Sequence, residues 1–122
     1  LLSVTAIRLV FTTLPDPEAA DKLAKALVET RLAACVNILA ACQSVYRWQD
    51  DVQVDGEVPL IIKTTAELYP ALETYIRQQH PYALPEIIAL DVAQGLPDYL
   101  NWVASVTGPE HPATNGVSAA KP

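Results

Sequence analysis

Residues 78–86, QQHPYALPE, carry the residue types best suited to metal or proton chemistry in this sequence. His80 and Glu86 are the two possible ligands, since imidazole binds Cu(II), Zn(II) and Ni(II) and a carboxylate can complete the coordination shell. A specific site normally needs three or four protein ligands, so the remainder would have to come from a neighbouring subunit. In the alternative interpretation His80 ends a helix at the negative end of its dipole, and Pro81 and Pro85 stiffen the turn into a strand.

A second group of possible ligands is acidic and lies in residues 50–57. Its four carboxylates have no lysine or arginine between them: Asp50, Asp51, Asp55 and Glu57. Carboxylate oxygens attract hard cations, but the spacing of a calcium-binding loop is absent. The alternative is a solvated hairpin tip without a specific ligand.

The two cysteines raise the question of nucleophilic or redox chemistry. Cys35 could act as a nucleophile with His80 as its base, whereas its apolar neighbours in LAACVNIL favour a packed thiol. In one continuous strand, Cys35 and Cys42 would lie about 23 Å apart at roughly 3.3 Å per residue, too far for a disulfide. We therefore expect two reduced thiols, as is usual in the cytosol.

Aromatic side chains are the remaining candidates for a pocket, and they are Tyr46, Trp48, Tyr82, Tyr99 and Trp102. Aromatic residues with a polar tip are also common in oligomer interfaces, so we expect Trp48 and Trp102 to pack at such an interface. Lys63 has two interpretations. It could face an inter-subunit cleft together with Tyr82 and Glu86, or extend from its apolar strand into water.

Four segments rich in β-branched residues are predicted to be strands: 4–13, 33–49, 52–65 and 86–92. Only Asp50 and Asp51 separate the second segment from the third, which predicts a long hairpin, although no glycine is present to favour a tight primed turn. Gly56 and Pro59 predict a bulge or a sheet edge in the second arm. We expect such a long arm to bend.

Three helices are predicted between and after these strands. Asp16 is a good N-cap for the first helix. Thr64 and Glu67 have the spacing of a capping box for the second helix, and Pro70, which would clash beyond a first turn, places its start nearer Glu67. The third helix follows Pro97.

The resulting order of elements is strand, helix, strand, strand, helix, strand, helix. It predicts an α+β fold of the ferredoxin-like βαββαβ type, an antiparallel sheet with two helices on one face, plus an extra C-terminal helix. Residues 1–106 are expected to form a single domain and residues 107–122 a flexible C-terminal tail rich in Pro, Ala, Gly and Ser. The other sheet face and the open strand edges favour assembly with copies of the same chain.

Composition limits the function. The 122 residues carry a net charge of −6, and the eight basic residues are scattered, which argues against nucleic acid and anionic membrane partners. No apolar run approaches the roughly 20 residues that span a membrane, and the start of the chain lacks signal-peptide features, so a cytoplasmic location is expected. Neither a phosphate-binding glycine loop nor a complete nucleophile and base set is present, so we do not expect an enzyme or an organic cofactor.

Five segments resemble, in order and spacing, those of the CutA family of divalent-cation tolerance proteins: RLAACVNI, SVYRW, EVPLIIKTT, HPYALPEIIAL and DYLNWV. The resemblance extends from Ile7 to Val103. It implies a tight homotrimer of ferredoxin-like subunits joined by edge-to-edge strand pairing, similar in architecture to the PII signalling proteins. It also implies binding of divalent metal, Cu(II) above all.

The sequence departs from the family at several places. The copper ligands that the resemblance implies, a Cys and a His pair, correspond to Thr12, Gln79 and His80, so one of the three is present. Asp50 and Ala40-Ala41 replace the usual Gly and Pro-Gly of the hairpin, and Asp91 replaces a Pro. These changes affect turns more than the core.

Two functions are therefore expected. The first is a non-enzymatic homotrimer that binds divalent metal, with Cu(II) preferred, through His80 and Glu86. The second is a PII-like signalling or scaffold trimer that binds a small anionic ligand or a protein partner at inter-subunit clefts, near Lys63 and Tyr82.

Overall fold

The structure is a computed structural model that describes residues 5–109, which form five strands and three helices. In chain order these are β1 (Ile7–Leu14), α1 (Pro17–Glu29), β2 (Cys35–Ile38), β3 (Cys42–Trp48), β4 (Asp51–Thr65), α2 (Tyr69–Gln79), β5 (Ile88–Asp91) and α3 (Pro97–Ser105). The predicted α+β fold with an antiparallel sheet, a long bent hairpin and an extra C-terminal helix is confirmed. The predicted tail from residue 110 onward lies outside the described residues.

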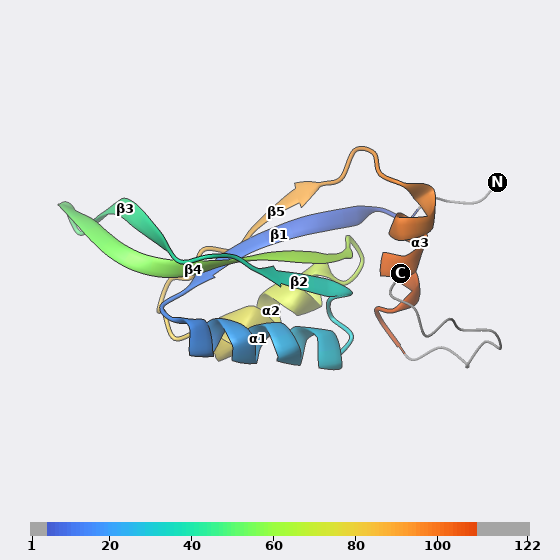
Figure 1. The fold of residues 1–122 in the computed structure, drawn as a ribbon, viewed down its shortest axis with the longest axis horizontal. Helices are drawn as coiled ribbons and strands as arrows, with labels where there is room; N and C mark the ends of the chain where they lie inside the picture. Colours follow the sequence, from blue (N-terminus) through green and yellow to red (C-terminus); the bar gives the residue numbers. More distant parts are fainter. Residues whose placement is uncertain (1–4, 110–122) are drawn as a thin grey trace.

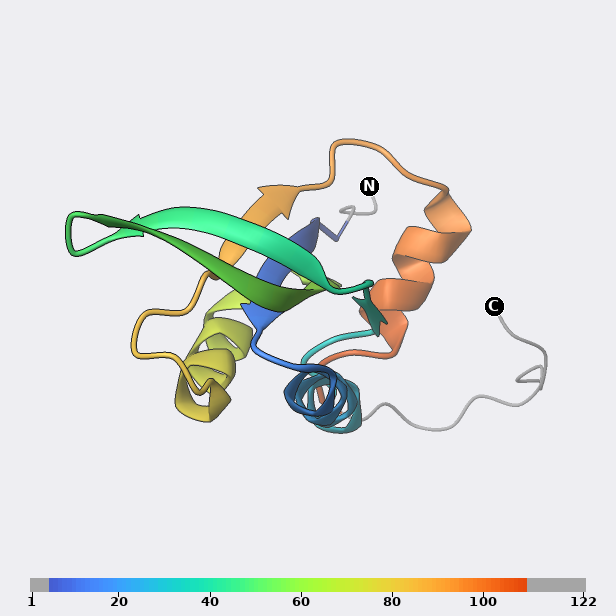
Figure 2. The same ribbon diagram turned by 60° about the vertical axis from the view of Figure 1, so that its left-hand side comes forward.

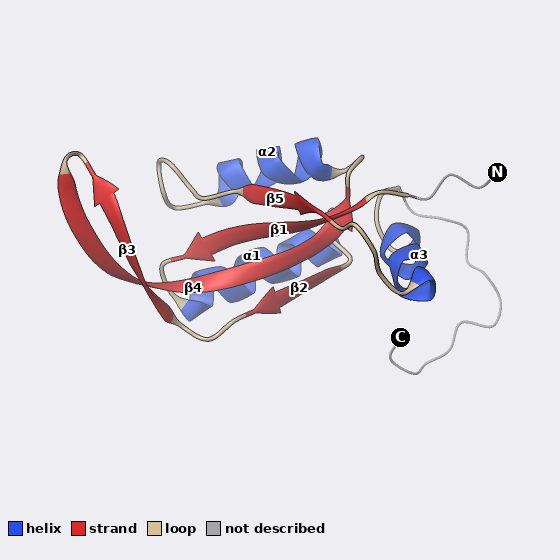
Figure 3. Cartoon of the chain, turned by 90° about the horizontal axis from the view of Figure 1, so that it is seen from above, coloured by secondary structure: helices blue, strands red, loops and turns tan. Residues whose placement is uncertain are grey.

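Strand β4 is the centre of the sheet, whose order is β2-β4-β1-β5 (Figure 3). Its C-terminal half pairs with β1 on one side and β2 on the other, and its N-terminal half pairs with β3. The hairpin of β3 and β4 therefore projects beyond the rest of the sheet, as Figures 1 and 2 show. At the opposite end of the long axis lies α3 (Figure 1).

Helices α1 and α2 cover one face of the sheet, and the main core lies between them and the strands (Figure 1). Side chains alternate along a strand, so every second residue of β1 and β4 faces these helices. The larger buried members of this core are Val10, Leu14, Leu23, Leu27, Val58, Leu60, Ile62, Leu72 and Ile76.

The other sheet face is only partly covered. The register places on it Leu9, Phe11, Cys35, Asn37, Ile61, Lys63, Ile88 and Leu90, which we call the open face. Ile88 and Leu90 are each 52% exposed. Helix α3 covers one end of this face, where Val103 packs with Ile7 and Ala34. Within residues 5–109, a large apolar area of the sheet is thus left without a partner.

The turn of the hairpin is a tight one even though it contains no glycine. Trp48 pairs with Asp51, which leaves two turn residues, and both have positive φ: 49° at Gln49 and 70° at Asp50. These are the backbone angles of a primed two-residue turn. Arg47 Nη1 donates to the carbonyl of Asp50 at 3.2 Å.

A one-residue bulge at residues 39–41 separates β2 from β3. Ile38 pairs with Leu60 and Cys42 already pairs with Glu57, so three residues of one arm lie opposite two of the other. An extra residue of this kind bends a strand and increases its twist. The run from 33 to 49 that the sequence predicts as one strand is therefore two strands.

Of the two alternatives predicted for Gly56 and Pro59, a bulge in the second arm is wrong, because β4 runs without a break and the extra residue lies on the facing arm. Gly56 does lie at a sheet edge, since within the described residues it pairs with β3 alone. Pro59 is tolerated in this central strand for a geometric reason. Its carbonyl accepts a hydrogen bond from the Leu39 N–H at 3.0 Å. The backbone nitrogen of Pro59, which has no hydrogen to donate, points to the same side as its carbonyl. It therefore faces the bulged segment, where regular pairing is absent.

Helix α2 begins at Tyr69 rather than near Glu67, so the predicted capping box does not form. Pro70 consequently lies in the first turn, where a proline is compatible with a helix. Thr64 remains in β4 and is fully buried, with its hydroxyl donating to the carbonyl of Leu32 at 2.7 Å. The hydroxyl of Thr65 instead accepts from the Leu68 N–H at 3.2 Å.

Helix α1 begins as predicted, with the Asp16 carboxylate accepting from the Ala19 N–H at 2.8 Å. It ends at Glu29, and Arg31, two residues further on, has a φ of 64° and a guanidinium that donates to the carbonyls of Gly108 and Ser105. The Gly108 N–H donates back to the Arg31 carbonyl at 2.9 Å. Packed structure thus continues through Gly108, beyond the expected limit of the domain at residue 106.

An ion pair joins the edge strand β5 to its neighbour β1. The two atoms are Asp91 Oδ1 and Arg8 Nε, 2.9 Å apart.

The helices are short. Within residues 5–109, none is long and apolar enough to cross a membrane.

Candidate functional site

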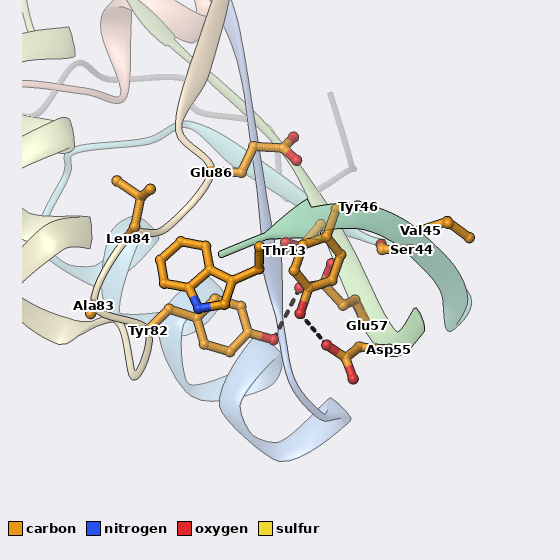
Figure 4. Close-up of a pocket in the computed structure, with 11 residues that line it drawn as sticks. Thr13, Ser44, Val45, Tyr46, Asp55, Glu57, Tyr82, Ala83, Leu84 and Glu86 are labelled. Carbon is orange, nitrogen blue, oxygen red and sulfur yellow. Dashed lines mark hydrogen bonds between the residues drawn. The ribbon is translucent and has the colours of Figure 1, made fainter. Parts of the chain in front are cut away.

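A groove lies between one face of the β3–β4 hairpin and the segment that follows α2 (Figure 4). We call it the hairpin groove. Its volume is about 590 Å³, and it is lined by Thr13, Ser44, Val45, Tyr46, Trp48, Asp55, Glu57, Tyr82, Ala83, Leu84 and Glu86. These residues come from β1, β3, β4 and the loop between α2 and β5, so the fold assembles the groove from four separate parts of the chain.

Two tyrosine–carboxylate pairs form one wall of the hairpin groove. The Tyr82 hydroxyl donates to Glu57 Oε2 at 3.0 Å, and the Tyr46 hydroxyl donates to Asp55 Oδ2 (Figure 4). The pKa of Tyr82 is raised well above its ordinary value. Burial is the larger cause, and the hydrogen bond to Glu57 is the next. The hydrogen bond to Asp55 raises the pKa of Tyr46. Both phenols therefore act as donors that hold carboxylates in place.

His80 holds the loop of the groove in position through both of its ring nitrogens. Its Nδ1 accepts a hydrogen bond from the Tyr82 N–H at 3.1 Å, so the proton lies on Nε2, which donates to the Thr13 carbonyl at 2.7 Å. The side chain is buried, and this burial lowers the pKa of His80, while the bond to Thr13 and the charge of Glu57 oppose the shift. In this arrangement neither nitrogen offers a lone pair to a ligand.

Glu86 lines the groove on the loop side, as Figure 4 shows, and its side chain is exposed. It is one of three carboxylates in the lining, with Asp55 and Glu57. Within the described residues, no three His, Cys, Asp or Glu side chains converge closely enough to hold a metal ion. A single chain therefore supplies oxygen ligands but not a complete metal site, and metal binding through His80 and Glu86 stays a prediction.

Lys63 lies away from the hairpin groove. On the open face its ammonium contacts Asn37 Oδ1 and lies 3.8 Å from Cys35 Sγ. Cys35 therefore has Lys63 beside it, whereas His80 is bonded to Thr13 and Tyr82, so the proposed nucleophile and base are not paired. Both cysteines are free, Cys35 half-buried and Cys42 exposed.

The two tryptophans have different surroundings. Trp48 lines the groove and is 45% exposed. Trp102 is half-buried on α3, with its ring 5.4 Å from that of Tyr99. Their predicted place in a subunit interface stays a prediction.

Sequence reasoning did not join Tyr46 and Asp55 to Tyr82 and Glu57 in one site. Within the hairpin, the signal was available, because a two-residue turn would put Ser44 opposite Asp55 and hence Tyr46 diagonally next to it. The approach of Tyr82 depends on how the loop after α2 packs. No local pattern specifies that contact.

The chain is similar to proteins of one family over most of its length. The family model described as "CutA1 divalent ion tolerance protein" matches residues 8–106. A "Divalent-cation tolerance protein CutA" of Thermus thermophilus is 48% identical over 99 residues, 81% of this chain and 96% of that protein. A mouse "Protein CutA" is 47% identical over 80% of this chain but only 55% of its own length.

Solved structures agree with this similarity. The "Divalent cation tolerance protein (Cut A1)" of Thermus thermophilus superimposes with a TM-score of 0.82 at 47% identity, over 84% of this chain and 99% of that one. The CutA1 structure of Oryza sativa gives a TM-score of 0.84 at 41% identity, over 87% and 98% of the two chains.

Proposed function

Because this chain belongs to the CutA1 divalent ion tolerance protein family, we propose that it is a non-enzymatic, cytoplasmic homotrimer that binds a divalent cation, Cu(II) by preference, in the hairpin groove. The observation that supports this proposal most directly is the charge of the groove. Asp55, Glu57 and Glu86 contribute carboxylates, and none of the lining residues is basic. A cation is therefore the kind of ligand that the groove attracts, rather than the anionic ligand of the PII-like alternative.

Glu86 is the first ligand in this proposal, because it is exposed to the groove and no phenol holds it as Tyr82 holds Glu57. His80 becomes a second ligand only if its ring gives up the bond to the Tyr82 N–H or to the Thr13 carbonyl. The remaining ligands come from a neighbouring subunit, since one chain does not bring three together within residues 5–109. Imidazole and carboxylate together suit Cu(II) and Zn(II).

The open face and the projecting hairpin support the homotrimer. Ile88 and Leu90 are half-exposed on the open face, and Val45, Val52 and Val54 are more than half-exposed on the hairpin. Apolar surface of this extent in a small domain marks an interaction surface. Sedimentation at micromolar concentration should give three times the monomer mass, and a monomer would contradict the proposal.

The absence of enzymatic activity is supported by the way the reactive groups are used. His80 is bonded through both nitrogens to backbone groups, and the thiol of Cys35 contacts Lys63 rather than a base. No nucleophile, base and orienting group are thereby brought together at these positions.

Calorimetric titration of the metal-free protein with Cu(II), in a competing weak chelator, tests the metal site. We expect Glu86→Gln to weaken binding by roughly tenfold, a typical loss for a ligand or its close support. Glu29→Gln is the matched control, because it removes the same charge from an exposed position at the end of α1.

The variant His80→Ala separates the two possible roles of the histidine. Weaker binding in both His80→Ala and Glu86→Gln would identify both as ligands. Weaker binding in Glu86→Gln alone would leave His80 with its structural role. Unchanged affinity and stoichiometry in both variants would overturn the proposed site.

A further inference from the structure

The hairpin groove combines aromatic faces with carboxylates, a pairing that a metal ion does not need. Three of its eleven lining residues are aromatic, Tyr46, Trp48 and Tyr82, and none is lysine or arginine. Its volume of about 590 Å³ is large for a metal ion and lies within the range of pockets that hold small organic molecules. Size and lining therefore leave room for a ligand larger than an ion, and the charge requires that it be a cation.

The aromatic side chains are accessible and suited to attract positive charge. In the single chain, Trp48 is 45% exposed and Tyr46 is 40% exposed, so both rings are accessible from the groove. The face of an indole or phenol ring carries the negative part of its quadrupole and attracts cations. Tyr46 and Tyr82 both donate their hydroxyl hydrogen to a carboxylate, which increases the electron density of the phenol ring.

The arrangement of the carboxylates also favours an organic cation. A metal ion needs several ligand atoms at nearly the same point, and within residues 5–109 no three possible ligands converge in that way. An alkylammonium group carries its charge on a larger and more apolar surface. It can contact an aromatic face on one side and a single carboxylate on the other without close convergence of ligands.

We propose that the hairpin groove binds a low-molecular-weight organic cation, a quaternary or primary ammonium compound, through the ring of Trp48 and the carboxylates of Glu57 and Glu86. This goes beyond the proposed metal function and does not depend on it, since the ring contributes nothing to metal coordination. The class of ligand is opposite in charge to the small anion expected at an inter-subunit cleft.

Choline and its uncharged isostere 3,3-dimethylbutan-1-ol test the proposal, because the two molecules have nearly the same shape and differ in charge. Both are titrated by calorimetry into the full-length, metal-free protein at low ionic strength. We expect choline to bind roughly tenfold more tightly than the alcohol, the ratio that corresponds to a cation held by one aromatic face and a carboxylate.

Variants then locate the binding. Trp48→Leu should remove the preference for choline over the alcohol, Trp48→Phe should keep most of it, and Glu57→Gln should weaken choline roughly tenfold. Glu29→Gln, which removes a carboxylate from the end of α1, should leave choline binding unchanged. Trp48→Leu should also leave the affinity for Cu(II) unchanged, which separates this inference from the metal site.

Two results would overturn the proposal. One is equal affinity of the parent protein for choline and the alcohol. The other is choline binding that is unchanged in both Trp48→Leu and Glu57→Gln, which would place the cation elsewhere. If circular dichroism shows that Trp48→Leu is unfolded, Glu57→Gln and Trp48→Phe decide the outcome by themselves.

Discussion

The hydroxyl of Tyr82 donates to Glu57 across 25 positions of the chain, and this contact joins the loop after α2 to the base of the hairpin. On the loop side, the Tyr82 N–H donates to His80, which in turn donates to Thr13 of β1. A continuous set of hydrogen bonds therefore runs from the edge of β4 through the loop to β1. It fixes the position of the groove relative to the sheet.

The contact between Tyr82 and Glu57 should stabilise the fold by a measurable amount. We expect Tyr82→Phe and Glu57→Gln each to lower the free energy of unfolding, and the double variant to lower it by less than the sum. The difference should be about 0.5–1 kcal/mol, as for a partly exposed hydrogen bond to a carboxylate. Denaturant titration of all four proteins measures it, and strict additivity would show that the contact does not contribute.

His80 should make stability depend on pH in a defined direction. Burial lowers the pKa of His80 in the folded protein, so between its unfolded value near 6.5 and the lower folded value the unfolded chain binds more protons. The free energy of unfolding contributed by His80 is therefore fully present above about pH 6.5 and decreases as the pH falls. For one proton the slope cannot exceed about 1.4 kcal/mol per pH unit.

His80→Gln tests this dependence because an amide can donate to the Thr13 carbonyl but does not titrate. Unfolding is followed by denaturant at pH values between 5 and 8. We expect the variant to be less stable at pH 8 and to have a smaller slope below pH 6.5. An identical slope in both proteins would assign the pH dependence to other groups.

Replacement of Thr12 by valine should make the folded protein more stable. Thr12 is 1% exposed, and its hydroxyl has no hydrogen-bond partner within the described residues. Valine has nearly the same shape without the unsatisfied group, so Thr12→Val should raise the free energy of unfolding by about 1 kcal/mol. The matched control is Thr64→Val, which removes a hydroxyl that donates to Leu32 and should destabilise by a similar amount. Thermal unfolding of both variants checks the opposite signs.

Replacement of Asp50 by glycine should make the folded protein more stable. Its φ of 70° lies in the left-handed region, where glycine is not strained. Asp50→Gly should raise the free energy of unfolding by about 0.5 kcal/mol, since relief of backbone strain exceeds the added entropy of the unfolded chain. Asp51→Gly, one residue further and inside β4, should destabilise instead. Equal effects of the two substitutions in denaturant titrations would count against this account of the turn.

The features that sequence predicted correctly are those with local signals. Asp16 caps α1 through its own neighbour three residues on, and the alternation of β1 and β4 places their core residues without reference to the rest of the chain. The start of α2 was missed because Thr64 has two possible roles. Its pairing within β4 and its bond to Leu32 are tertiary interactions that prevail over a capping box.

The site was predicted only in part, for a related reason. Sequence identified His80 and Glu86 as the residues to examine, and the structure places both beside the groove. What His80 does there depends on the carbonyl of Thr13, 67 positions away. The contact of Tyr82 with Glu57 depends on how the loop after α2 packs against the hairpin, and no local pattern specifies it.

The length of the turn at Gln49 and Asp50 determines which side chains of β3 reach the groove. Because Trp48 pairs with Asp51, the even-numbered positions of β3, including Tyr46 and Trp48, share a face with the odd-numbered positions of β4. A slip of one position in this pairing would turn Arg47 toward the groove in place of the two rings and bring a positive charge to its acidic wall. The chemical character of the groove is thus set by a turn that does not line it.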